Sequence, residues 1–120
     1  MRLHHVQVSC PPGGEPGARR FYGVLLGLTE VDKPEPLRAR GGVWFRQDGV
    51  ELHVGVEEGF VPARKAHPAF AVGDVAGVAE TVGAAGHPVS WNDAIPGLRR
   101  FHTQDAHGNR VEIQAEAPTG

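Results

Sequence analysis

The chain has 120 residues, of which 40% are hydrophobic and 22% are charged, and its formal net charge is -2. This composition is that of an ordinary globular domain, and without a surplus of Lys and Arg there is no reason to expect a nucleic-acid or membrane-surface partner. A single cysteine cannot form an internal disulfide, and no stretch approaches the roughly 20 apolar residues of a membrane span. The N-terminus lacks the basic-then-apolar pattern of a signal peptide, so we expect a cytoplasmic protein.

The first half of the sequence predicts the order β-α-β-β-β. Residues 3–9 alternate as a strand does, and the Pro- and Gly-rich run after them marks a turn. The next segment predicts a helix, because four apolar residues recur at helical spacing: Phe21, Val24, Leu25 and Leu28. Three β-prone runs follow, "LTEVD", "GGVWFRQ" and "VELHVGV", and turn residues separate them.

The second half predicts the same order. "PAFAV" is strand-like, Asp74 is placed to cap a helix through "VAGVAETVGAA", and Gly86 is placed to end it. "PVSW", "RRFHTQ" and "RVEIQA" then supply three more strands. We therefore expect one domain built from two βαβββ units, at about 1–57 and 67–116, with a linker at about 58–66 and a tail at 117–120.

A histidine and a glutamate recur in both halves at nearly one separation. His5 precedes Glu51 by 46 positions, and His67 precedes Glu112 by 45. Because each unit leaves one sheet face apolar, we expect the two sheets to curve into a half-open barrel lined by alternate strand residues. Imidazoles and carboxylates on such an inner face are costly unless they are paired or bind a metal. The four residues together therefore predict a cation site.

The order of these motifs resembles the vicinal oxygen chelate superfamily, also called the glyoxalase/bleomycin-resistance/dioxygenase family, over nearly the whole chain. The resemblance is carried by "LHHVQV", "FYGVLLGL", "HPAFAVGDV" and "RRFHTQDAHGNRVEI", the last of which is similar to the family's terminal hairpin. Its turn, "DAHGN", departs from the family pattern of Pro and an aromatic residue at the second and third positions. The resemblance implies an α+β fold of tandem βαβββ units that form a cupped half-barrel sheet.

In metal-using relatives the first strand of each unit supplies a histidine and the last strand supplies a glutamate. The resemblance thus implies one divalent ion (Ni, Zn, Mn or Fe) held, as in glyoxalase I, by His5, Glu51, His67 and Glu112. A set of three without Glu51 would instead resemble thiol transferases that give antibiotic resistance, or Fe(II) dioxygenases. His53 lies two residues after Glu51 and projects to the same face, so it is the competing ligand or a residue that orients one.

The function implied by the resemblance is that of a metal-dependent, glyoxalase-like lyase or isomerase. Such an enzyme chelates two neighbouring oxygens of a small substrate and stabilises an enolate, and Glu112 or Glu51 would move the proton. The candidate substrate-binding residues are His53 and Arg100, because arginine suits a carboxylate or phosphate on a ligand. The alternatives are a metal-free, bleomycin-resistance-like binding protein, and an Fe(II) dioxygenase or thiol transferase. Since short relatives form homodimers with sites shared between the chains, we expect a homodimer here.

Overall fold

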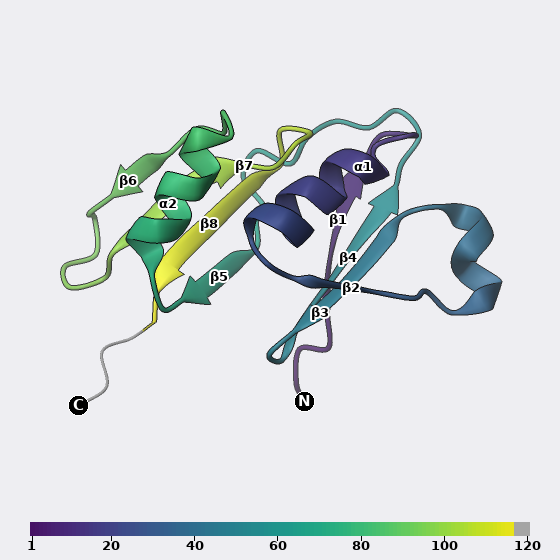
Figure 1. Ribbon diagram of the computed structural model, residues 1–120, viewed down its shortest axis with the longest axis horizontal. Coiled ribbons are helices and arrows are strands. Elements are labelled where there is room, and N and C mark those ends of the chain that lie inside the picture. Colours follow the sequence, from purple (N-terminus) through teal and green to yellow (C-terminus); the bar gives the residue numbers. More distant parts are fainter. Residues whose placement is uncertain (117–120) are drawn as a thin grey trace. The chain divides into compact units, whose positions relative to one another are not determined.

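The chain divides into two compact units, Met1–Pro62 and Ala63–Gly120. The computed structural model describes residues 1–116, so the predicted tail at 117–120 lies outside the described residues. Each unit contains a four-stranded mixed sheet and follows the order strand, helix, three strands (Figure 1). The predicted fold class, α+β with two βαβββ units, is confirmed.

Unit 1 has the strand order β1-β4-β3-β2, in which β1 and β4 are parallel and the other pairs are antiparallel. Its strands are β1 (Val6–Cys10), β2 (Thr29–Val31), β3 (Val43–Gln47) and β4 (Val50–Val56), and a 3-10 helix that the sequence did not predict, η2 (Glu35–Arg40), precedes β3. Asp48 and Gly49 join β3 to β4 with φ of 48° and 82°. Two successive positive φ angles are typical of a two-residue hairpin turn, and this turn fixes the β3–β4 register.

The helical segment of unit 1 differs from the prediction. It begins as α1 (Glu15–Ala18) and continues as a π-helix, η1 (Arg19–Leu25). A π-helix closes its hydrogen bonds five residues back, so residues three and four apart rotate away from a common face. The predicted helical face is therefore wrong at Val24, which is 69% exposed, whereas Tyr22 is buried beside Phe21.

Unit 2 has the strand order β5-β8-β7-β6. Its elements are β5 (Ala69–Val72), α2 (Val75–Ala84), β6 (Ser90–Asn92), β7 (Arg100–Gln104) and β8 (Arg110–Ala115). Asp74 caps α2 as predicted, because its side chain accepts a hydrogen bond from the N–H of Gly77 at 3.0 Å. Helix α2 packs on β8 (Figure 1). Among residues 1–116, no helix is both long and apolar enough to cross a membrane.

Alternate residues of the central strands form the core of unit 2. Phe101 of β7 faces its cross-strand partner Ile113 of β8, and both are at most 1% exposed. Since successive side chains of a strand point to opposite faces, His102 and Glu112 lie on the other side of the sheet. The packing of the apolar face thus determines which face carries the polar residues.

Candidate metal centre

The β7–β8 hairpin sets the register of the candidate site. The carboxylate of Asp105 accepts hydrogen bonds from the backbone N–H of His107 (2.9 Å) and Asn109 (3.1 Å), and the Asn109 side chain donates to it at 2.9 Å. Asp105 and Asn109 are both buried, so leaving either group unsatisfied would cost about 1–3 kcal/mol. The turn is therefore firmly defined, and the register that follows from it places His102 directly opposite Glu112.

One carboxylate oxygen, Oε1 of Glu112, is the centre of the cluster. It lies 3.3 Å from Nε2 of His67, 3.1 Å from Nε2 of His102 and 3.3 Å from Nη1 of Arg100. The potential ligand atoms of the two histidines and Glu112 all lie within 4.8 Å of one another. Two ligands that each lie about 2.0–2.2 Å from one cation are about 3.0–3.5 Å apart. The two distances from Oε1 of Glu112 to the histidine nitrogens therefore fit ligation of a single divalent ion.

The hydrogen bonding of His67 also fits a metal ligand. Its Nδ1 lies 2.7 Å from the carbonyl oxygen of Lys65, and because a carbonyl only accepts, Nδ1 carries a hydrogen. In the neutral ring, Nε2 then presents a lone pair toward the Glu112 carboxylate. The hydrogen bond of Nε2 with Glu112 at 3.3 Å therefore requires a second ring hydrogen, and a cation shared between the two groups would take the place of that hydrogen. A backbone carbonyl that orients the ring in this way is typical of metal-binding histidines.

The electrostatics of the cluster keep Glu112 ionised. Burial by itself raises the pKa of this carboxyl, but the hydrogen bond with His67 and the charge of Arg100 outweigh it, and the pKa is lowered overall. Burial lowers the pKa of His102, and the nearby charge of Arg110 lowers it further. A neutral imidazole beside an ionised carboxylate is the protonation state that a divalent cation requires of its ligands.

The corresponding face of unit 1 is arranged differently. Glu51 lies opposite Arg46 and accepts a hydrogen bond from its Nε at 2.8 Å, which is the main cause of a lowered Glu51 pKa. The ring of His53 stacks on Trp44 and on His5, with ring centroids 3.7 and 4.1 Å apart. Burial, and next the charge of His5, lower the His53 pKa. Its buried Nε2 lies 3.7 Å from Glu51 and has no hydrogen-bond partner in the described part of the chain.

The structure brings together two of the predicted ligands, His67 and Glu112, and adds His102, which the sequence analysis missed. A signal for His102 is present in the hairpin. His102 and Glu112 are each five residues from His107, the centre of the turn, and antiparallel pairing brings such residues opposite each other. The same reasoning, applied to the two-residue turn of unit 1, pairs Glu51 with Arg46.

The two predicted His–Glu pairs do not occupy equivalent register positions. Val6 pairs with Leu52, so the register continued by one residue brings His5 opposite Glu51. In unit 2 the residue opposite Glu112 is Ala69, and His67 lies two residues before it. The near-equal separations of 46 and 45 in the sequence therefore do not correspond to equal positions in the strand register, although the order of elements is repeated.

The fold and the sequence are both similar to those of solved proteins. A putative glyoxalase family protein from Bacillus anthracis is 41% identical, with a TM-score of 0.91 over 97% of this chain and 95% of that one. A glyoxalase/dioxygenase from Nostoc punctiforme is 21% identical, with a TM-score of 0.79 over 98% and 92% of the two chains.

A third solved structure is a mutant of the fosfomycin resistance protein FosX from Listeria monocytogenes, complexed with Mn(II) and 1S,2S-dihydroxypropylphosphonic acid. It is 16% identical, with a TM-score of 0.78 over 95% and 91% of the two chains, a likeness that concerns the fold alone. Neither a protein-family profile nor a curated protein matches the chain.

Proposed function

Because this chain belongs to the glyoxalase family, within the vicinal oxygen chelate superfamily, we propose that it is a metal-dependent enzyme acting on a small substrate with two neighbouring oxygens. The observation that carries the proposal is the convergence of His67, His102 and Glu112 within unit 2. A divalent cation, when bound, supplies Lewis acidity that stabilises negative charge developing on the substrate oxygens.

The residues of unit 2 have distinct roles in this proposal. His67 and His102 donate imidazole nitrogens, and the Lys65 carbonyl holds His67 in the tautomer whose Nε2 is free to do so. Glu112 contributes its carboxylate, and since its pKa is lowered it is ionised at neutral pH and able to accept a proton from a substrate carbon. We also keep His5 and Glu51 of unit 1 in the proposed ligand set, with Glu51 as the second candidate base, because the resemblance assigns them there.

The donor set limits the choice of metal. Two imidazoles and a carboxylate suit Mn, Fe, Ni and Zn better than Ca or Mg, which favour oxygen donors alone. The FosX structure with Mn(II) and a small phosphonic acid supports the pairing of this fold with a divalent ion and a small ligand. Like the short relatives, the protein is proposed to act as a homodimer.

The test of this proposal is metal binding by the purified protein. Chelator-treated wild type, titrated with Mn²⁺, Ni²⁺, Zn²⁺ and anaerobic Fe²⁺, should bind one ion per chain. His102→Gln should bind about 10–100-fold more weakly, as is common when a metal site loses a supporting group. The matched control is His87→Gln, a histidine of unit 2 whose ring instead contacts the Gln104 carbonyl, and its affinity should stay that of wild type.

Two outcomes would contradict the proposal. If wild type binds none of the four ions, the proposed enzyme gives way to the alternative function, a metal-free protein that binds a small molecule. Equal affinities of wild type and His102→Gln would mean that the ion is held elsewhere in the chain.

A further inference from the structure

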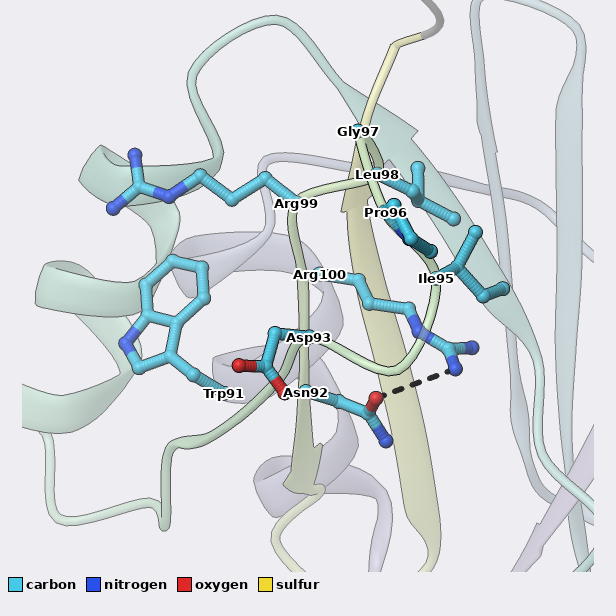
Figure 2. A pocket seen from close by; sticks show the side chains of 9 residues that line it. All are labelled: Trp91, Asn92, Asp93, Ile95, Pro96, Gly97, Leu98, Arg99 and Arg100. Atoms are coloured by element: carbon cyan, nitrogen blue, oxygen red, sulfur yellow. Dashed lines mark hydrogen bonds between the residues drawn. The ribbon is translucent and has the colours of Figure 1, made fainter.

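Unit 2 contains a cavity of about 550 Å³ at the β6–β7 connection, which is within the usual size range for small-molecule sites. Its apolar lining includes Trp91, Ile95 and Leu98, and its polar lining includes Asn92 and Arg100 (Figure 2). Arg100 also contacts Glu112, and is therefore the residue that the cavity shares with the metal ligands.

The guanidinium of Arg100 is incompletely paired. Nη1 lies 3.3 Å from Oε1 of Glu112 and Nη2 lies 3.5 Å from Oδ1 of Asn92, both long for hydrogen bonds to this group. Its Nε is buried and has no hydrogen-bond partner among residues 1–116. Figure 2 shows Arg100 reaching toward Asn92, whereas Arg99 extends the other way, where its guanidinium lies 4.6 Å from the centre of the Trp91 ring. Arg100 thus retains capacity for a better, bidentate partner.

Arg100 and a metal ion would compete for the same oxygen. Oε1 of Glu112, which accepts from Arg100, is also the oxygen that faces Nε2 of His67 and Nε2 of His102. An ion held by these three side chains would bind the lone pairs of Oε1 that accept the hydrogen bond from Arg100, and the charge of the ion would repel the guanidinium. The distances therefore make the Arg100–Glu112 pair and metal binding mutually unfavourable.

We propose that Arg100 couples metal binding to recognition of an oxyanion on the ligand: the ion displaces Arg100 from Glu112, and the released guanidinium binds a carboxylate, phosphate or phosphonate group in the cavity. The inference rests on the proposed metal site and names its substrate class as small molecules that carry an oxyanion beside the two neighbouring oxygens. By thermodynamic reciprocity, an oxyanion that binds Arg100 must strengthen metal binding by the same factor as the metal strengthens anion binding.

The experiment measures Mn²⁺ affinity from the electron paramagnetic resonance signal of free Mn²⁺, in chloride buffer with and without acetate or methylphosphonate. Protein-free samples correct for Mn²⁺ bound by the anions themselves. Wild type should bind Mn²⁺ at least about fivefold more tightly with one of the anions, the lower end of usual coupling strengths. The planar and tetrahedral anions distinguish a carboxylate substrate from a phosphate or phosphonate one.

Arg100→Ala and Arg100→Gln should both lose this anion dependence and should bind Mn²⁺ in chloride at least as tightly as wild type, because both remove the positive charge that competes for Glu112. Glutamine keeps a donor toward Glu112, so it tests the inference even if the alanine variant does not fold. The matched control, Arg64→Ala, removes the same charge from an exposed position of unit 2 that does not line the cavity, and it should respond to anions as wild type does.

The possible results separate the two proposals. Mn²⁺ binding that neither anion alters, or an anion effect that persists in both Arg100 variants, overturns the coupling and leaves the metal site standing. Weaker Mn²⁺ binding by the Arg100 variants in chloride also overturns it, because Arg100 would then support the metal rather than compete with it. Failure of wild type and variants alike to bind any metal overturns the proposed function and the coupling together.

Discussion

Replacing Glu112 by glutamine keeps the shape of the side chain and removes its charge, so it tests the electrostatic description of the cluster directly. The side chains of Glu112 and Arg100 are 7% and 18% exposed. Breaking a fully buried ion pair costs about 3–5 kcal/mol, and an exposed one contributes about 0–1 kcal/mol. Because Arg100 is partly exposed and glutamine still offers it an oxygen, we expect an intermediate loss of about 1–2 kcal/mol.

The loss in free energy of unfolding converts to a measurable change in melting temperature. For a chain of 120 residues, 1 kcal/mol corresponds to about 4 °C. The Tm of metal-free Glu112→Gln should therefore lie about 4–8 °C below that of metal-free wild type.

The larger expected difference is in the response to metal. At an ion concentration 100 times its Kd, wild type gains about 2.7 kcal/mol, or about 11 °C. If Glu112→Gln weakens binding about 100-fold, the gain at the same concentration falls to about 0.4 kcal/mol, or about 2 °C.

Calorimetric scans with chelator and with Mn²⁺ or Zn²⁺ measure both quantities on one sample. Glu80→Gln is the matched control, because Glu80 is exposed on α2 and the same substitution there should alter neither the metal-free Tm nor the metal-induced shift. An undiminished metal-induced shift in Glu112→Gln would refute the reasoning, since the ion would then be held without this carboxylate.

Three further predictions concern the rest of the chain. Glu51→Gln should both weaken metal binding and slow proton transfer in a methylglyoxal–thiol adduct. His53→Ala should leave metal affinity intact. A metal titration that gives the opposite pattern would identify His53 as the ligand. The pKa values of His53 and His102 are lowered below 6.5, so the unfolded chain binds protons first as the pH falls. The free energy of unfolding of metal-free protein should thus be fully retained above about pH 6.5 and should decline below it, and urea titrations of His53→Gln should show a shallower decline. Sedimentation at micromolar concentration should give twice the 12.8 kDa mass of one chain, and a 12.8 kDa species would contradict the homodimer.

The order of the elements along the chain and the positions of the turns were predictable because they depend on local chemistry. A period of two and turn residues such as Asp48 and Gly49 are visible in the sequence, and they locate β3 and β4 with small errors at the ends. The face of the first helix was not predictable in the same way. A prediction from apolar spacing assumes 3.6 residues per turn. The π-helical hydrogen bond from the Leu26 N–H to the Phe21 carbonyl changes the number of residues per turn, and with it the direction in which the later side chains point.

The candidate site was predictable in part for a related reason. His67 and Glu112 follow from the family resemblance, because metal-using relatives supply a histidine from the first strand of each unit and a glutamate from the last strand. His102 depends on the pairing register of the last hairpin, and this register follows from how Asp105 and Asn109 close the turn. The pairing of Arg100 with Glu112 depends on side-chain direction across two strands, which no spacing rule specifies.

The different registers of the two units bear on how a repeated scaffold can carry different side chains at equivalent positions. Aligned by strand pairing, Arg46 of unit 1 is the counterpart of His102, and Leu3 is the counterpart of His67. Unit 1 therefore retains the carboxylate of the cluster at Glu51 but neither imidazole at these two positions. The strand pairing thus lets equivalent positions of one scaffold carry an ion pair in unit 1 and two imidazoles beside a carboxylate in unit 2. Protein engineering could test this equivalence, since Leu3→His and Arg46→His would set two imidazoles around Glu51 in the pattern of unit 2.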